Sequence, residues 1–363
     1  MTGVLGLGKY NRVVVSMKTN AAQPNLHTDL LRRSQSSAKM QSEILVYITS
    51  EANPQAGEET VGPLNINIGG YRVQPEIREN TFDAGIVTIN YAEISSSSTP
   101  LVLLHGGSNR WQSFNNILSD LAATWHVYAP DFRGHGKSTW VPGTYRLQDY
   151  ADDTIAFLQH CLKEPAYVFG HSLGGMVALL VTAQFPDGVR AVAVGDAPLS
   201  SQAWQATSHQ NRDRKLTWRD LAGGQKPFDE VVEALKDTPI EVPDRVGSVP
   251  MREVTGEDAP VYTWLATCLQ QNDPDMLTAL LDRFETTAAG YEMNNVLPSI
   301  QCPVLLLQAD PTAGGLMTDR EVELALPLLD RPRHIRLQGI SHFLHIERKE
   351  PIVQALRAFF QSC

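Results

Sequence analysis

A short apolar run that ends at a glycine-flanked serine most constrains the fold of this chain. Residues 166–169 have the continuous apolar character of a strand buried on both faces, and Gly170-His171-Ser172-Leu173-Gly174 follows at once. A helical segment, residues 176–185, comes next. A serine on so sharp a strand-to-helix turn needs small residues two positions to either side, and glycine occupies both positions. The pattern therefore predicts a serine nucleophile, Ser172, on a strained turn.

Short apolar runs alternate with helical segments from about residue 71 onward. The expected strands are 71–80, 86–93, 101–104, 125–129, 166–169, 189–194, 303–307 and 334–337. The expected helices are 112–123, 147–162, 176–185 and a last helix from about Pro351. This alternation predicts an α/β fold with a mostly parallel sheet flanked by helices, its core formed by residues 71–198 and 300–363.

The regular alternation breaks between residues 199 and 299. An insertion of this length between two strands is more than a loop, so we expect a helical cap inserted there. Most of its aromatic residues are expected to hold the cap together, while one or two line an apolar substrate pocket. These aromatic residues are Trp204, Trp218, Tyr262, Trp264 and Tyr291.

Residues 1–70 precede the core and are expected to be disordered or poorly ordered. In residues 1–42, six basic side chains face only Asp29, in a segment rich in Ser, Thr, Asn and Gln. Such a composition buries too little apolar surface to offset the entropy lost on ordering. The segment is interpreted as an Arg- and Ser-rich transit peptide or as a flexible extension. A third interpretation is that the start codon is assigned too early and that Met40 is the alternative start.

Charge and cysteine placement exclude several classes of protein. The formal charge of −10 and a pI near 5.5 provide no basic face for nucleic acid. No run approaches the roughly 18 apolar residues of a membrane span. Cys161, Cys268, Cys302 and Cys363 are too far apart to indicate a metal site or a disulfide framework. We expect a cytoplasmic protein without a metal or an organic cofactor, and the oligomeric state stays open.

A second motif, His105-Gly106-Gly107, follows the buried run at 101–104. At this place in the fold a loop brings a backbone N–H group toward the nucleophile. We expect the N–H groups of Gly107 and Leu173 to form an oxyanion hole, helped by the positive end of the helix that starts at Leu173. His105 itself is expected to be structural.

Together these motifs resemble the α/β-hydrolase superfamily, in its capped branch of esterases, carbon–carbon bond hydrolases, lactonases and epoxide hydrolases. The resemblance covers residues 76–198 and 300–363 and includes Asp131 to Ser138 and Ser341 to Glu347. It implies a nucleophile–acid–histidine triad in that chain order, with Ser172 first and His342 last. His345 is a nearby competitor that the resemblance assigns to packing behind the loop.

The triad acid has more than one candidate. The family usually places it in a Gly-x-x-Asp turn, but here the turn reads Gln308-Ala309-Asp310-Pro311-Thr312, without the glycine and with an early carboxylate. We expect Asp310 to be the acid, with Asp196 as the alternative after the preceding strand and Asp319 as a third candidate. The aspartate without this role is expected to cap a turn. Arg133 and His135 are expected to belong to the scaffold.

Because the nucleophile is serine, an epoxide hydrolase mechanism, which needs a carboxylate nucleophile, is disfavoured. We expect hydrolysis of a small-molecule ester or lactone with an apolar acyl or aromatic part, through an acyl-enzyme on Ser172. Carbon–carbon bond hydrolysis and acyl transfer use the same three residues and stay open. A ligand-sensing protein with little turnover is the alternative from another class.

Overall fold

The computed structural model describes residues 76–242 and 247–363 in full and, nearer the amino terminus, the backbone of five short strands. These are β1 (Thr2–Leu7), β2 (Tyr10–Met17), β3 (Ile44–Tyr47), β4 (Asn67–Ile68) and β5 (Tyr71–Arg72). β1, β2 and β3 pair antiparallel, and so do β4 and β5. The remainder of residues 1–75 lies outside the described residues, so the disorder predicted for residues 1–70 stays a prediction. The chain divides into two compact units, Met1–Val61 and Gly62–Cys363.

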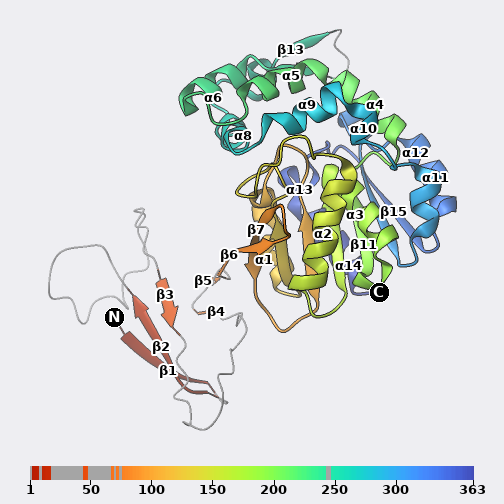
Figure 1. Cartoon of the computed structure of the whole chain (residues 1–363). Helices are drawn as coiled ribbons and strands as arrows, with labels where there is room; N and C mark the ends of the chain where they lie inside the picture. The colour runs from red at the N-terminus through yellow and green to blue at the C-terminus, as the bar shows by residue number, and fades with distance from the viewer. Residues whose placement is uncertain are drawn as a thin grey trace. The chain divides into compact units, whose positions relative to one another are not determined.

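An eight-stranded sheet forms the centre of the second unit (Figure 1). Its order is β15-β14-β11-β10-β8-β9-β7-β6. The strands are β6 (Arg78–Asp83), β7 (Thr88–Ile94), β8 (Pro100–Leu104), β9 (His126–Pro130), β10 (Ala166–His171), β11 (Val189–Gly195), β14 (Val304–Ala309) and β15 (Pro332–Leu337). Strands β8 to β15 of this sheet pair parallel, and β6 and β7 form an antiparallel edge. The predicted α/β class and the mostly parallel sheet are confirmed.

Alternate residues of the central strands face two different helical layers. Leu101 and Leu103 pack in one cluster with α1 (Asn115–Ala122) and α14 (Lys349–Phe360). Val102 and Leu104 pack in the other, with α2 (Leu147–Cys161) and α3 (Leu173–Gln184). Because side chains alternate across a strand, a strand covered on both faces is apolar at every position. This explains the continuous apolar runs in the sequence.

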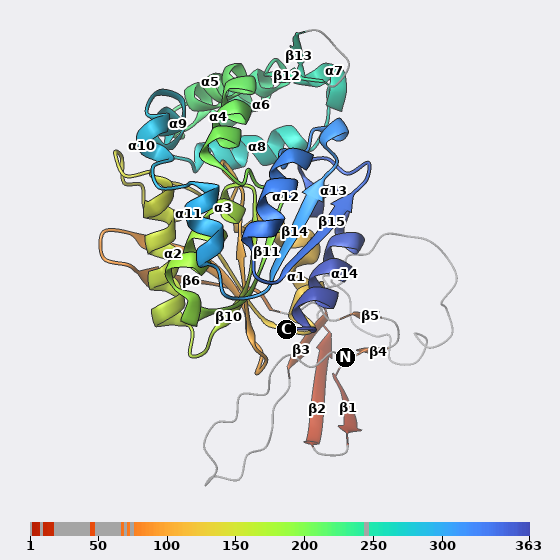
Figure 2. The ribbon, with the colours of Figure 1, turned by 90° about the vertical axis from the view of Figure 1, so that its right-hand side faces the viewer.

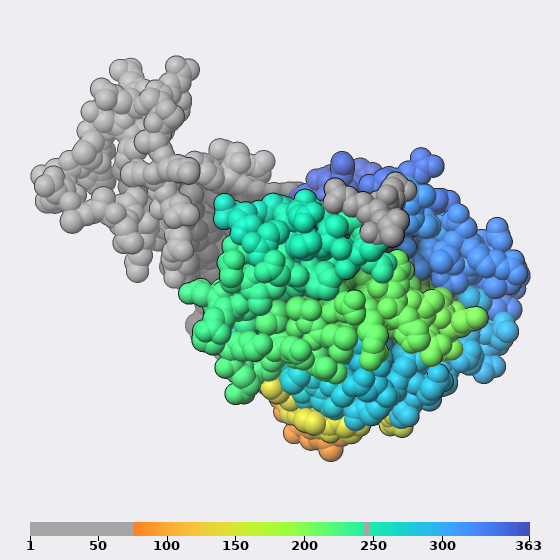
Figure 3. All heavy atoms as spheres, turned by 90° about the horizontal axis from the view of Figure 1, so that it is seen from above, coloured from red at the N-terminus to blue at the C-terminus, as the bar shows by residue number. Residues whose placement is uncertain are grey.

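The segment between β11 and β14 forms a helical insertion. It contains α4 (Ser201–Gln210), α5 (Arg212–Leu221), α6 (Phe228–Lys236), α7 (Met251–Thr255), α8 (Val261–Gln270), α9 (Pro274–Asp282), α10 (Phe284–Thr287), α11 (Met293–Val296) and the hairpin of β12 (Pro239–Glu241) and β13 (Ser248–Pro250). Figure 2 shows α4 to α9 above the carboxyl ends of the parallel strands, and Figure 3 shows the insertion covering this side. Insertion and sheet fall in one compact unit, so the predicted domain boundaries at 199 and 299 stay predictions.

The last part of the chain holds α12 (Asp319–Ala325), between β14 and β15, and α13 (Leu344–Glu347), just before α14. None of the helices in the described part of the chain combines the length and the apolarity that a bilayer crossing requires.

Candidate active site

Ser172 lies between β10 and α3 in a backbone conformation that few non-glycine residues adopt, with φ 55° and ψ −118°. The chain turns this sharply because the flanking glycines lack a β carbon. A Cβ on Gly170 would lie 2.0 Å from the carbonyl oxygen of Gly174, and a Cβ on Gly174 would lie 2.1 Å from the carbonyl oxygen of Leu104. The close approach of these backbones is the physical reason for the G-x-S-x-G pattern.

His342 lies in the loop between β15 and α13, and its ring meets Ser172. The Nε2 atom is 3.1 Å from Ser172 Oγ, and Nδ1 is 2.7 Å from Oδ2 of Asp196. A carboxylate only accepts hydrogen bonds, so Nδ1 carries the proton and Nε2 is left to accept from the hydroxyl. Three segments distant in the sequence therefore join in one hydrogen-bonded chain.

Asp196 is completely buried at the end of β11, with a φ of 42°. Its carboxylate accepts backbone N–H groups from Ala309 at 3.1 Å, Leu316 at 2.8 Å and Met317 at 3.1 Å, in addition to His342. These donors replace the water that burial removes, and they hold both oxygens in place. The imidazole of His342 thus contacts a rigid carboxylate.

Asp310 is placed differently, and this corrects the prediction that it orients His342. Its carboxylate accepts the Thr312 N–H at 3.0 Å, the Thr312 hydroxyl at 2.7 Å and the Gly339 N–H at 2.9 Å. These bonds, that of Gly339 first, lower the pKa of Asp310 to about 2. The Asp-Pro-Thr sequence turns the side chain back onto its own turn, where it caps residues 311–313.

Gly107 and Leu173 lie side by side next to Ser172. A Cβ on Gly107 would be 3.9 Å from Leu173 Cβ, and a Cβ on the adjacent Gly106 would be 3.3 Å from Ser172 Cβ. In the described part of the chain, neither the Gly107 N–H nor the Leu173 N–H has an acceptor among the hydrogen bonds. Two backbone donors and the amino end of α3 are therefore available near the serine oxygen.

His171 supports this arrangement, and sequence reasoning missed it. Its Nε2–H donates to the carbonyl oxygen of His342 at 2.8 Å, and the two ring centroids are 4.8 Å apart. Burial, with the nearby His342 as a smaller cause, holds the pKa of His171 well below its usual value. The neutral ring therefore ties the His342 loop to the serine turn. Its place inside the G-x-S-x-G pattern is the one sequence signal that pointed to it.

The remaining candidates make contacts of the scaffold. They are His105, Arg133, His135 and His345, which were expected to be structural, and Asp319, the third candidate for the acid. His345 packs face to face with Phe114 at 4.8 Å, behind the His342 loop. Arg133 forms a buried ion pair with Asp153 at 2.6 Å. The other scaffold contacts are His105 Nε2 with Phe132 N at 3.0 Å, His135 Nε2 with Ser108 N at 3.1 Å, and Asp319 Oδ2 with Arg336 Nη1 at 3.0 Å.

These buried histidines predict a stability that falls in mild acid. Burial lowers the pKa of His105 to about 4 and those of His135 and His345 to about 3, whereas an unfolded histidine titrates near 6.5. Below pH ~6.5 the unfolded state therefore binds more protons, and the free energy of unfolding falls as the pH falls. We expect a loss of about 1.4 kcal/mol per pH unit for each histidine that is protonated only on unfolding.

Urea unfolding across pH 7 to 5 measures this loss, because unfolded carboxyl groups titrate lower, near pH ~4. Buried carboxyl groups act in the opposite direction, since burial raises the pKa values of Asp131, Asp153 and Glu321, so the measured slope is the net of both. An unfolding free energy that stays constant over this range contradicts the prediction.

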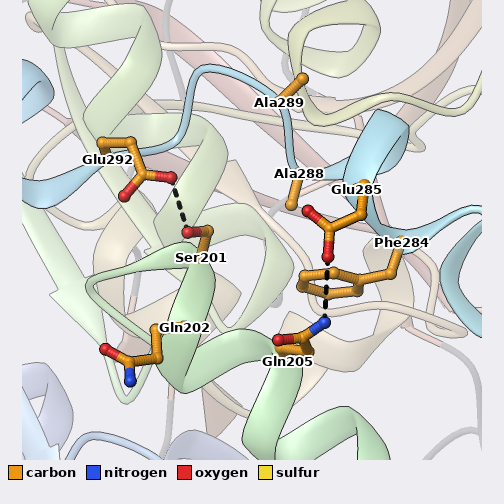
Figure 4. A pocket seen from close by; sticks show the side chains of 8 residues that line it. All are labelled: Ser201, Gln202, Gln205, Phe284, Glu285, Ala288, Ala289 and Glu292. Atoms are coloured by element: carbon orange, nitrogen blue, oxygen red, sulfur yellow. Dashed lines mark hydrogen bonds between the residues drawn. The ribbon is translucent and has the colours of Figure 1, made fainter.

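A hollow of about 210 Å³ lies elsewhere, within the insertion (Figure 4). It is lined by Ser201, Gln202, Gln205, Phe284, Glu285, Ala288, Ala289 and Glu292. Its carboxylates already accept hydrogen bonds, Glu292 from Ser201 at 2.7 Å and Glu285 from Gln205 at 3.2 Å. No residue of the serine site lines it. Within residues 76–242 and 247–363, no three His, Cys, Asp or Glu side chains gather as metal ligands would.

Comparison with known proteins identifies the same fold. A family model described as the alpha/beta hydrolase fold matches residues 99–222. The 3-oxoadipate enol-lactonase 2 of Acinetobacter baylyi is 26% identical over 219 residues, which is 51% of this chain and 81% of the relative. The 2-(acetamidomethylene)succinate hydrolase of Mesorhizobium japonicum is 34% identical over 115 residues, 31% of this chain and 41% of the relative.

A solved structure has the same fold. The crystal structure of an E-2-(acetamidomethylene)succinate hydrolase matches with a TM-score of 0.60 and 19% identity, covering 79% of this chain and all (100%) of that one. With this sheet, this serine turn and these relatives, the chain has the α/β-hydrolase fold and is a hydrolase.

Proposed function

We propose that the protein hydrolyses a small ester or lactone through an acyl-enzyme on Ser172. The observation that carries the proposal is the hydrogen-bonded chain from Ser172 Oγ through His342 to Asp196, at 3.1 Å and 2.7 Å. The same constellation activates a serine on several unrelated folds, so geometry and not ancestry supports the chemistry.

In the proposed mechanism, Ser172 Oγ attacks the substrate carbonyl while its proton passes to His342 Nε2. The N–H groups of Gly107 and Leu173 stabilise the oxyanion, each by about 3 kcal/mol. Collapse of the tetrahedral intermediate breaks the carbonyl–oxygen bond, and Nε2–H protonates the leaving alkoxide. Water, deprotonated by the same nitrogen, then releases the acid and restores Ser172. Asp196 holds the ring in the required tautomer throughout.

The names of the relatives favour an enol ester or lactone among the possible substrates. One relative is named for an enol-lactone, and another for hydrolysis of an acetamidomethylene succinate. Carbon–carbon bond hydrolysis and acyl transfer use the same residues, and turnover of a panel of esters, lactones and diketones distinguishes them. We also propose that the insertion acts as a cap over the site and that an apolar acyl part of the substrate binds beneath it. A cytoplasmic location belongs to the same proposal.

A fluorophosphonate reagent tests the nucleophile directly. We expect one adduct per chain, mapped by peptide mass spectrometry to Ser172, and loss of ester hydrolysis in step with labelling. The reagent mimics the tetrahedral intermediate, so it needs the activated hydroxyl and the oxyanion donors. Labelling of another residue, or full hydrolysis after complete labelling of Ser172, would contradict the proposal.

A further inference from the structure

Arg110 connects the oxyanion loop to the insertion. It follows Gly107 by three residues, and its guanidinium carbon lies 5.1 Å from the ring centre of Trp264 on α8. Its Nη1 donates to Gln271 Oε1, just past α8, over a long 3.4 Å. The neighbouring Asn109 accepts from Trp264 Nε1 at 3.3 Å. Gly106 of the same loop lies against Ser172, so the loop that carries Arg110 borders the serine site.

The charge of Arg110 has no counter-ion in contact with it. Among the described residues, no carboxylate lies within the 4.0 Å of an ion pair, and the buried Nε has no acceptor. The neighbouring thiol of Cys268 is neutral, because burial raises its pKa to about 12. Asp131 acts on Arg110 only from a distance, and its oxygens accept Trp111 N–H at 2.7 Å and Asn90 Nδ2–H at 2.8 Å.

A half-buried guanidinium without a carboxylate is costly, since desolvation is not offset by an ion pair. A ligand that supplies the carboxylate removes this cost. The planar guanidinium also offers N–H donors in a fork that matches a carboxylate geometrically, and its stacking on Trp264 fixes the plane of the fork. The side chain is therefore preorganised for an anionic partner.

We propose that Arg110 binds a carboxylate of the substrate, so that the enzyme prefers esters or lactones carrying a negative charge. The inference rests on the proposed function and deepens it by naming the substrate class. The acyl part of the substrate remains apolar near Ser172, and the charged end reaches the guanidinium. Arg110 is then a binding residue that determines specificity and takes no part in proton transfer.

A purely structural role for Arg110, as a clamp between the loop and α8, makes a different prediction. A clamp affects every substrate equally, because it acts through the position of Gly107. Recognition of a carboxylate affects only the charged substrate, and mainly through KM. A pair of substrates that differ only in charge therefore separates the two roles.

The test compares mono-4-nitrophenyl adipate with 4-nitrophenyl hexanoate, which have acyl chains of equal length. We expect wild-type kcat/KM to be about tenfold or more higher for the charged ester. In R110Q this advantage is expected to vanish through a rise in KM, while the neutral ester keeps its rate within about twofold. R110K, which keeps the charge but not the planar fork, is expected to lie between them.

Arg333 provides a matched control, because it is exposed and also stacks on an aromatic ring, that of Phe359, at 5.7 Å. R333Q is expected to change neither rate. Binding of both esters to the Ser172→Ala protein, with and without R110Q, is measured by calorimetry as a readout free of turnover. Equal binding of the two esters to the Ser172→Ala protein, or an equal loss of binding of both when R110Q is added, overturns the inference.

Failure of the proposed function gives a different result. If the neutral ester is cleaved at the same rate with and without the Ser172 hydroxyl, the acyl-enzyme proposal fails. If cleavage depends on Ser172 but charge has no effect on rate or binding, only the assignment of Arg110 fails. The neutral ester also reports that R110Q is folded.

Discussion

Replacing Ser172 by alanine is expected to lower hydrolysis of a 4-nitrophenyl ester by about ten-thousandfold or more in kcat. The substitution removes the one oxygen that His342 Nε2 contacts at 3.1 Å, so no acyl-enzyme forms. The oxyanion donors of Gly107 and Leu173 remain, which leaves a small residual rate above that of water. Initial rates with the purified wild-type and variant proteins measure the effect.

Ser108 serves as the matched control for this variant. It is also a serine with positive φ, 58°, one residue from Gly107, and its contact with His135 is made by its backbone N–H. S108A is therefore expected to keep the rate within about threefold, because the side-chain oxygen takes no part in the chain from Ser172 to Asp196. A wild-type rate no higher than that of S172A, with both near the uncatalysed rate, would instead favour the alternative that the protein binds ligands without useful turnover.

The second large effect is expected for D196N, which should lower kcat by about ten-thousandfold. Oδ2 of Asp196 accepts the Nδ1–H of His342 at 2.7 Å, and an amide nitrogen in its place reverses that bond. The imidazole then holds its proton on Nε2 and cannot accept one from Ser172. In the wild type, Oδ2 also accepts the N–H of Leu316 at 2.8 Å, and an amide nitrogen there would lose this hydrogen bond. Thermal unfolding of D196N is therefore measured together with its rate, to separate a loss of stability from a loss of catalysis.

D310N is the control for this prediction and is expected to keep kcat within about threefold. The Asp310 carboxylate contacts Thr312 and Gly339 and has no hydrogen bond to His342. The opposite pattern, a collapse in D310N with a near-normal D196N, would return the role of the acid to Asp310.

Asp196 and Asp310 explain why the sequence left the acid open. They follow β11 and β14, which are neighbours in the sheet, and parallel strands end at the same edge. Their strands alone therefore place both carboxylates at the same edge of the sheet. The sequence did carry a signal against Asp310, because its turn lacks the family's glycine and places the carboxylate too early. An aspartate directly before Pro-Thr bonds to its own turn, as Asp310 does to Thr312.

Local sequence determined the parts of the site that one strand and one turn can form. The serine turn needs only an apolar strand, two glycines and a helix start, so Gly170 to Gly174 predicted its strained geometry. The alternation of apolar runs and helical segments likewise predicted the parallel sheet, because burial on both faces leaves no other pattern. His342 followed from its place between the last strand and the last helix.

Tertiary structure decided which side chains meet across distant segments. Asp196 rather than Asp310 reaches His342, because the backbone N–H groups around residues 309–317 hold its carboxylate toward the loop after β15. Likewise, only the folded chain brings Arg110 against Trp264 of the insertion. The sequence determines the local conformational preferences of the backbone. Contacts between distant segments depend on how the separate elements pack against one another, so carboxylates and cations that are equivalent in the sequence differ in the folded protein.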